Sequence, residues 1–299
     1  MFVRICLLTI LLIPATHEVA PAAIRTFSFY VAPHGADKNP GSAAKPFKTL
    51  TQAQQAVRTA RQTGGMGKCY VFLRSGNYEL TEPLKFGPAD GGTEKYPVIY
   101  TVSTGEKATI CGGKTISDWT QLAPELATAE VPWLVEPQEA KPEVPAEGDK
   151  PAAPAVPEVV GVKWSFTELI VNRERVELVP LQAPPTDATE IPEPGQWFLD
   201  VENRKVYYRL KKKETQEQLE TIVPMIRSLI IVQGNKDEEK PVKNLRFDGI
   251  RFFCNTLAKP AGDSPELGGV ISFRDSENCS VTNCTFDMIE EPTVFFGNQ

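Results

Sequence analysis

The feature that most constrains the fold is a repeat of short strand-like segments between Leu229 and Gln299. Three apolar runs resemble one another: Leu229–Gly234, Val270–Asp275 and Thr293–Asn298. Two further segments, Leu245–Phe252 and Cys279–Phe286, alternate apolar and polar residues with the period of two that is typical of a β-strand. The interval from Val270 to Thr293 is 23 residues, whereas the interval from Leu229 to Val270 is 41 residues.

Two loops account for the longer interval. The extra residues lie near Asp237–Lys240 and near Lys259–Gly262, outside the strand-like segments. In a solenoid each turn contacts only its neighbours, so insertions collect in the loops and the strands stay in register. Asn and Gly tolerate the left-handed backbone that tight turns need. Four such residues fit the turns between the segments: Asn244, Gly249, Asn278 and Asn283.

These segments resemble the coils of the right-handed parallel β-helix of the pectin-lyase-like superfamily. The opening of the chain is similar to that of exported, carbohydrate-active members, in which a strand, a turn and a helix precede the first coil. Here the strand is Phe27–Val31, and Thr49 with Gln52 forms the capping box of a helix that ends at Gly64-Gly65. The fold class predicted is therefore all-β, a right-handed parallel β-helix (solenoid) with an N-terminal capping helix and an inserted β-rich arm.

The composition divides the chain into five segments. We predict a signal peptide at 1–22, the N-terminal cap and first coils at 23–135, and an extended insertion rich in Pro, Glu and Ala at 136–162. A small β-rich arm follows at 163–224, with hairpins at Leu169–Val176 and at Trp197–Arg209, and further coils occupy 225–299. Because the insertion buries little apolar surface, we expect its deletion to leave stability nearly unchanged.

The N-terminus predicts export. Arg4 supplies a positive charge, Ile5–Ile13 is an apolar run too short to span a bilayer, and Ala20–Ala22 is a small-residue cleavage site. We therefore expect a secreted or periplasmic protein. The formal net charge is −6 and no basic stripe occurs, which argues against nucleic acid and anionic membranes as partners.

The cysteines do not predict a complete disulfide framework. Six are present, and five remain once Cys6 is removed with the signal peptide. Cys279 and Cys284 take the places of Leu245 and Ile250 in the preceding coil, so we expect stacked apolar side chains rather than zinc ligands. No cofactor is predicted. Asp37 and Asn39 offer oxygen ligands for calcium, but turn chemistry explains this pair better.

The candidate catalytic residues are acids on the repeated segments. Glycoside hydrolysis needs two carboxylates that face each other across a sugar. The acids considered are Asp248, Asp275, Asp287, Glu290 and Glu291, and we select Asp275 and Asp287 as neighbouring strand-end carboxylates. The alternative for each is a solvated turn residue. Trp164, Trp197, Tyr207 and Tyr208 could stack on sugars, or fill the core of the arm.

The resemblance implies a protein that acts on polysaccharide, either as a glycoside hydrolase or, as runner-up, as a polysaccharide lyase. A non-catalytic glycan-binding or structural β-helix is the alternative. What distinguishes them is a convergent pair of carboxylates, or an acid with Arg or Lys, in one groove. No polar capping repeat follows Phe296, so we expect a β-helix that looks truncated at its C-terminal end. We therefore expect poor catalysis by this chain. The alternative is self-association through the open C-terminal coil.

Overall fold

The computed structural model describes residues 25–65, 67–134, 166–256, 269–290 and 293–297. The predicted signal peptide at 1–22, the whole of the predicted insertion at 136–162, and Glu291 lie outside these residues. None of the helices in the described residues is both long and apolar enough to cross a membrane.

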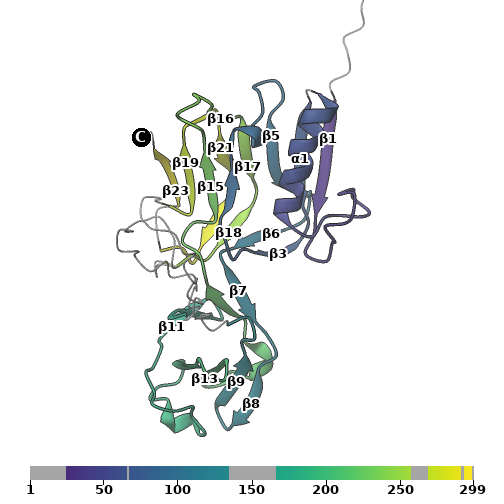
Figure 1. Ribbon diagram of the computed structural model, residues 1–299. Helices are drawn as coiled ribbons and strands as arrows, with labels where there is room; N and C mark the ends of the chain where they lie inside the picture. The colour runs from purple at the N-terminus through teal and green to yellow at the C-terminus, as the bar shows by residue number, and fades with distance from the viewer. Residues whose placement is uncertain (1–24, 66, 135–165, 257–268, 291–292, 298–299) are drawn as a thin grey trace, which may run out of the picture.

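Parallel strands form the upper part of the molecule in Figure 1, and they belong to three larger sheets and one two-stranded sheet. The first sheet contains, in order, β1 (Thr26–Val31), β2 (Lys68–Leu73), β5 (Val98–Val102), β17 (Leu245–Asp248) and β21 (Ser280–Thr282). The second contains β3 (Gly76–Glu79), β6 (Ala108–Cys111), β18 (Arg251–Phe253) and β22 (Thr285–Asp287). The third contains β4 (Leu84–Phe86), β15 (Ile230–Gln233), β19 (Ile271–Arg274) and β23 (Val294–Gly297), and a small pair joins β16 (Val242–Lys243) to β20 (Ser276–Glu277).

Antiparallel strands form the lower part, which we call the arm. One sheet contains β11 (Glu174–Val176), β10 (Leu169–Val171), β14 (Thr221–Pro224) and β7 (Gly113–Ile116). The other contains β12 (Trp197–Asp200), β13 (Lys205–Arg209), β9 (Leu126–Glu130) and β8 (Thr120–Ala123). Both predicted hairpins are confirmed, because β10 pairs with β11 and β12 pairs with β13 in antiparallel register.

The predicted fold class, a right-handed parallel β-helix, is wrong. The described residues form six separate sheets in which parallel and antiparallel pairing both occur, rather than one solenoid. The chain leaves the parallel sheets after Cys111 and pairs again with them only at Ile230. Residues 113–130, which we expected among the first coils, pair with β13 and β14 of the arm instead. The C-terminal repeat could not reveal this, because the arm strands lie outside it.

The strand pairing predicted for the C-terminal repeat is confirmed. β15 pairs in parallel with β19, and β19 pairs in parallel with β23, so that Val232, Phe273 and Phe296 are aligned. Likewise β17 pairs with β21, and β18 with β22. The spacing of the apolar segments sets this register, because a shift of one residue would turn every buried side chain outward.

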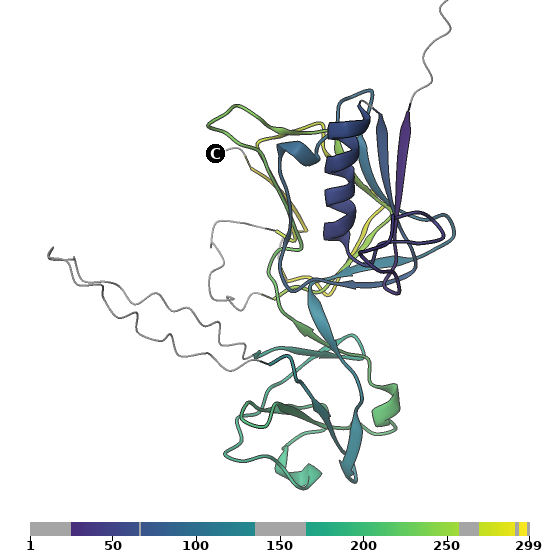
Figure 2. The same cartoon turned by 45° about the vertical axis from the view of Figure 1, so that its right-hand side comes forward.

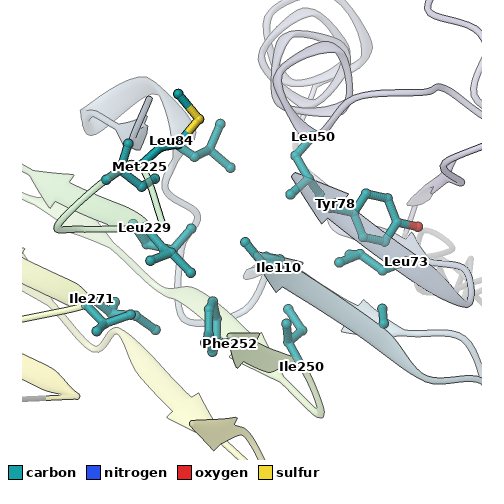
Figure 3. Packing of buried hydrophobic residues seen from close by; sticks show 14 of the residues in the cluster. Leu50, Leu73, Tyr78, Leu84, Ile110, Met225, Leu229, Ile250, Phe252 and Ile271 are labelled. Atoms are coloured by element: carbon teal, nitrogen blue, oxygen red, sulfur yellow. The ribbon is translucent and has the colours of Figure 1, made fainter. Parts of the chain in front are cut away.

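The core of the parallel part fills the space between the three sheets. Tyr78, Ile110 and Phe252 are aligned on β3, β6 and β18 and point inward together, beside Leu84 and Leu229 (Figure 3). Full burial of each such aliphatic or aromatic side chain contributes about 1.5–3 kcal/mol. This packing fixes the opposite face of the second sheet, which is where β18 and β22 meet the arm.

The only helix longer than one turn in the described residues is α1 (Leu50–Gly64), and it lies beside β1 (Figure 2). As predicted, Thr49 caps it, and its Oγ1 accepts a hydrogen bond from the Gln52 N–H at 3.2 Å. The other half of the predicted capping box does not form, because the Thr49 N–H donates to Asp37 rather than to Gln52. Asp37 holds the cap, because its Oδ1 accepts from the N–H groups of Lys48 and Thr49, both at 2.9 Å. The turn interpretation of Asp37 is therefore confirmed.

Candidate functional site

The arm meets the second parallel sheet at a charged junction, formed where β18 and β22 end and the β10–β11 hairpin begins. Asn172 and Arg173 at the tip of that hairpin have φ values of 49° and 67°. Two consecutive left-handed residues are typical of a two-residue hairpin turn. The Asn172 side chain anchors the tip, since its Oδ1 accepts from the Glu220 N–H and its Nδ2 donates to Glu214 Oε1, each at 3.0 Å. The turn thereby presents Arg173 to the parallel sheet.

Asp287 binds two arginines from different parts of the chain. Its Oδ2 accepts hydrogen bonds from Nη2 of Arg173, at 2.5 Å, and from Nη2 of Arg251. Asp287 on β22 lies opposite Phe253 on β18, and Arg251 comes from that same neighbouring strand, β18. The carboxylate is mostly buried, with 21% of its side chain exposed, which strengthens charged hydrogen bonds relative to those in water.

Arg175 binds two more carboxylates at the same junction. Its Nη1 lies 2.5 Å from Glu168 Oε2, and its Nε lies 3.0 Å from Glu290 Oε1. Nη2 donates to the backbone oxygens of Asn255, at 2.7 Å, and Met288, at 3.1 Å. Glu168 and Glu290 therefore contact one guanidinium, so both carboxylates lie close together where the arm meets the sheet.

Asn255 positions this pair from the interior. It is fully buried, its Oδ1 accepts from the Glu290 N–H at 2.9 Å, and its Nδ2 donates to the Arg227 carbonyl oxygen at 3.1 Å. Because its own carbonyl oxygen accepts from Arg175, one buried residue orients both members of the Arg175–Glu290 pair. We call Glu168, Arg173, Arg175, Arg251, Asp287 and Glu290 the junction cluster.

A groove runs alongside the junction cluster. Its cavity of about 130 Å³ lies between the outer face of the second sheet and the arm, with Arg173 and Arg251 in its wall. Asn77 and Thr109 line it as well, and they are aligned with Arg251 on successive strands β3, β6 and β18. Side chains that alternate outward on neighbouring strands thus form one polar row.

The two acids selected from the sequence lie on different sheets. Asp275 follows β19 of the third sheet with φ 45°, and its Oδ2 accepts a hydrogen bond from Gln233 Nε2 at 3.0 Å. Asp287 ends β22 of the second sheet, and the two carboxylates have no hydrogen-bond partner in common among the described residues. Of the other candidates, Glu290 joins Asp287 in the junction cluster, whereas Asp248 bonds to Thr282 and Asn283.

Sequence reasoning missed the arginines and Glu168. Residues 173–175 read Arg-Glu-Arg in a segment that the sequence predicts to be a hairpin, which places the two arginines near its turn. That pattern was the available signal. It does not identify the acids they bind, since Arg173 and Asp287 are 114 residues apart in the chain.

A second hollow lies within the arm and has a volume of about 420 Å³. Two carboxylates line it, Asp118 and Glu130, together with Lys205 and Trp133. The Lys114 ammonium lies 5.1 Å from the centre of the Trp133 ring. Aromatic rings beside carboxylates and hydroxyls are the surroundings in which proteins bind sugars, whose rings have an apolar face and a polar rim.

The aromatic residues proposed as sugar platforms occupy the core instead. Trp197 and Tyr208 are fully buried and Tyr207 is 7% exposed. Trp197 Nε1 donates to the Val176 carbonyl oxygen at 3.0 Å, and the Tyr208 hydroxyl lies 3.1 Å from Glu214 Oε2. The core interpretation of these three is confirmed, and Trp164 lies outside the described residues.

Cys279 and Cys284 are half-buried against the core, as expected for residues that replace Leu245 and Ile250. In the part of the chain that the structure describes, no group of three or more His, Cys, Asp and Glu side chains is arranged to hold a metal ion.

Comparison with known proteins gives two similar structures. No family model matches the sequence, and no curated protein matches it. A solved structure titled "Glycoside hydrolase" is 22% identical, with a TM-score of 0.59. The match covers 88% of this chain and 62% of the chain in that structure. A structure titled as the complex of XylC with xylose is 15% identical, with a TM-score of 0.52. The match covers 88% of this chain and 41% of the chain in that structure.

The chain thus spans about three fifths of the first structure and two fifths of the second. At these identities the likeness shows that the chain shares their fold. The structural neighbours of this chain are therefore glycoside-hydrolase-like proteins.

Proposed function

We propose that this chain is part of an exported protein that acts on polysaccharide, as a glycoside hydrolase. The junction cluster carries the proposal. Its acids bind arginines, two of which line a groove, and an acid with an arginine in one groove is the feature expected of a carbohydrate-active site rather than of a purely structural module. The fold shared with a glycoside hydrolase and with XylC, whose structure contains xylose, adds support. Export rests on the N-terminal segment at 1–22.

Glu168 and Glu290 are the pair best placed for two-carboxylate chemistry, because both contact Arg175. Hydrolysis of a glycosidic bond uses one carboxyl group to protonate the leaving oxygen and another as nucleophile or base. Asp287 and its two arginines would bind sugar hydroxyls nearby. Asp275 remains a proposed catalytic residue at a separate place on the third sheet.

The first experiment incubates the purified chain with neutral and acidic polysaccharides and measures new reducing ends. We expect slow hydrolysis of at least one neutral polysaccharide, and loss of roughly 10²–10⁴-fold in rate for Glu290→Gln, since that is the usual contribution of a general acid or base. Asp287→Asn and Asp275→Asn test the two acids selected from the sequence. Glu202→Gln, an exposed acid in an arm turn, is the matched control and should keep full activity.

Other products would change the assignment. An unsaturated sugar end, detected by its ultraviolet absorbance, would identify a lyase. Turnover that survives Glu168→Gln and Glu290→Gln but is lost in Asp275→Asn would move the site to the third sheet.

Glycan binding without turnover is the second candidate, and the arm hollow favours it. Trp133 lies beside Asp118 and Glu130 in a space of a size that suits a small ligand. Affinity electrophoresis in gels that contain each polysaccharide would measure retardation. Retardation that Trp133→Ala abolishes, with no reducing ends released by any variant, would favour the binding protein over the hydrolase.

A further inference from the structure

Two free thiols lie side by side where the chain leaves the parallel sheets for the arm. Cys111 is the last residue of β6 and Cys254 directly follows β18. Their sulfur atoms are 3.6 Å apart, although 143 residues separate them in the chain. Both side chains are buried, with 1% and 0% of their surface exposed.

The surroundings hold the two cysteines together. Cys111 lies directly opposite Phe253 in the parallel pair of β6 and β18, and both cysteines pack with Ile170 of the arm. The Gly112 N–H donates to the Phe253 carbonyl oxygen at 2.9 Å. A Cβ on Gly112 would lie 2.4 Å from the Cys254 carbonyl oxygen, so only glycine permits this close approach. Bond formation requires the sulfur atoms to close from 3.6 Å to the roughly 2 Å of an S–S bond.

We infer that Cys111 and Cys254 form a disulfide bond when the chain folds in an oxidising compartment. In that reaction the two S–H groups lose two protons and two electrons, and one S–S bond forms. A low-molecular-weight disulfide accepts the electrons and is reduced to two thiols by thiol–disulfide exchange. The bond would link the exit of β6 to the residue that precedes Asn255, and so would fix the residue that orients Glu290 and Arg175.

Burial determines when the bond forms. A thiolate is the attacking species, and the hydrogen bond that the Cys254 thiol shares with Cys111, followed by burial, raises the pKa of Cys254 well above its ordinary value. An oxidant therefore reaches these sulfur atoms during folding rather than afterwards. Once formed, the bond is protected from reductants by the same burial.

The remaining described cysteines serve as internal controls. Cys279 and Cys284 are half-buried and directly precede β21 and β22. Each sulfur contacts backbone oxygen atoms rather than another sulfur. Cys69 is buried on β2. If proximity decides the pairing, these three cysteines stay reduced under the conditions that join Cys111 to Cys254.

The test is refolding of the full chain with reduced and oxidised glutathione, followed by alkylation and peptide mapping without reductant. We expect one cross-linked peptide pair that contains Cys111 and Cys254, and a loss of two titratable thiols after denaturation. Tm should be about 10 °C higher than that of the reduced protein, because the bond closes a long loop. Cys254→Ser should remove this difference, and Cys279→Ser should keep it.

Three results would overturn the inference. They are refolded chain with every thiol free, a cross-link that uses Cys279, Cys284 or Cys69, and equal Tm values for the oxidised and reduced forms. Peptide mapping does not require a stable variant, so the first two results stay informative even if Cys254→Ser fails to fold. The outcome is independent of the proposed hydrolysis, since it is measured on the thiols alone.

Discussion

At the scale of single residues, two buried tyrosines differ in the hydrogen bonding of their hydroxyl groups. Tyr78 is 5% exposed, and its hydroxyl lies 2.8 Å from the Val31 carbonyl oxygen and 2.9 Å from that of Arg74. Tyr100 is 2% exposed, and its hydroxyl has no hydrogen-bond partner among the residues that the structure describes. Burial, and then the nearby charge of Asp90, raise the pKa of Tyr100, so its hydroxyl stays neutral and still costs desolvation energy.

The two tyrosines should therefore respond in opposite ways to loss of the hydroxyl. We expect Tyr100→Phe to raise the free energy of unfolding by about 1 kcal/mol, because an unsatisfied buried group is removed. Tyr78→Phe, the matched control, should lower it by about 1 kcal/mol, because a hydrogen bond is lost. Urea unfolding of both variants measures the difference. A Tyr100→Phe variant that is less stable than the wild type would show that its hydroxyl is satisfied in solution.

At the scale of elements, helix α1 is joined to the parallel sheets by both apolar and polar contacts. Leu50, Ala53 and Val57 are buried on one face. On the same helix Arg58 forms a two-pronged ion pair with Asp90, at 2.6 and 2.7 Å, and Asp90 is 1% exposed. The predicted apolar face was broader, since Ala56 and Ala60 are only half-buried.

Ala53 and Ala56 provide a test of how α1 covers the sheets. Ala53→Asp places an unpaired charge where no surface is exposed, and we expect it to lower the free energy of unfolding by about 3 kcal/mol or more. Ala56→Asp, three residues further along the same helix, should cost less than half as much because water reaches that position. Denaturant unfolding gives both values. Equal costs for the two substitutions would mean that α1 does not cover the core as the structure has it.

At the scale of the whole molecule, the edge of the third parallel sheet exposes an aromatic side chain. Phe296 on β23 is 64% exposed, and its ring stacks on Phe273 with 4.9 Å between ring centres. Among the described residues β23 pairs only with β19, so its outer edge has unpaired backbone groups. Such an edge favours pairing with a second chain.

Self-association of this chain is therefore a prediction that sedimentation velocity can check. We expect the sedimentation coefficient to rise with concentration for the wild type, and Phe296→Lys to abolish the rise. Leu122→Lys changes another exposed apolar side chain, 50% exposed and on the arm, and should leave association intact. A wild-type chain that stays monomeric at every concentration, or equal effects of the two substitutions, would exclude this edge as the interface.

The sequence alone determined the local elements. The Thr49 cap, the two glycines at the end of the helix, both hairpins and the pairing of the C-terminal strands follow from residues close together in the chain or from a regular spacing. Such features depend on the backbone preferences of a few neighbouring residues and on the alternation of apolar side chains. They could therefore be predicted without knowledge of the rest of the molecule.

Only the tertiary structure decided how these elements combine. It divides the strands among separate sheets and adds β7, β8 and β9 to the arm. It also brings Arg173 from a hairpin turn to Asp287, and Cys111 to Cys254, across 114 and 143 residues. The physical reason is that an ion pair or a thiol contact depends on where two distant side chains lie once the core has packed. No periodicity in the sequence encodes that position.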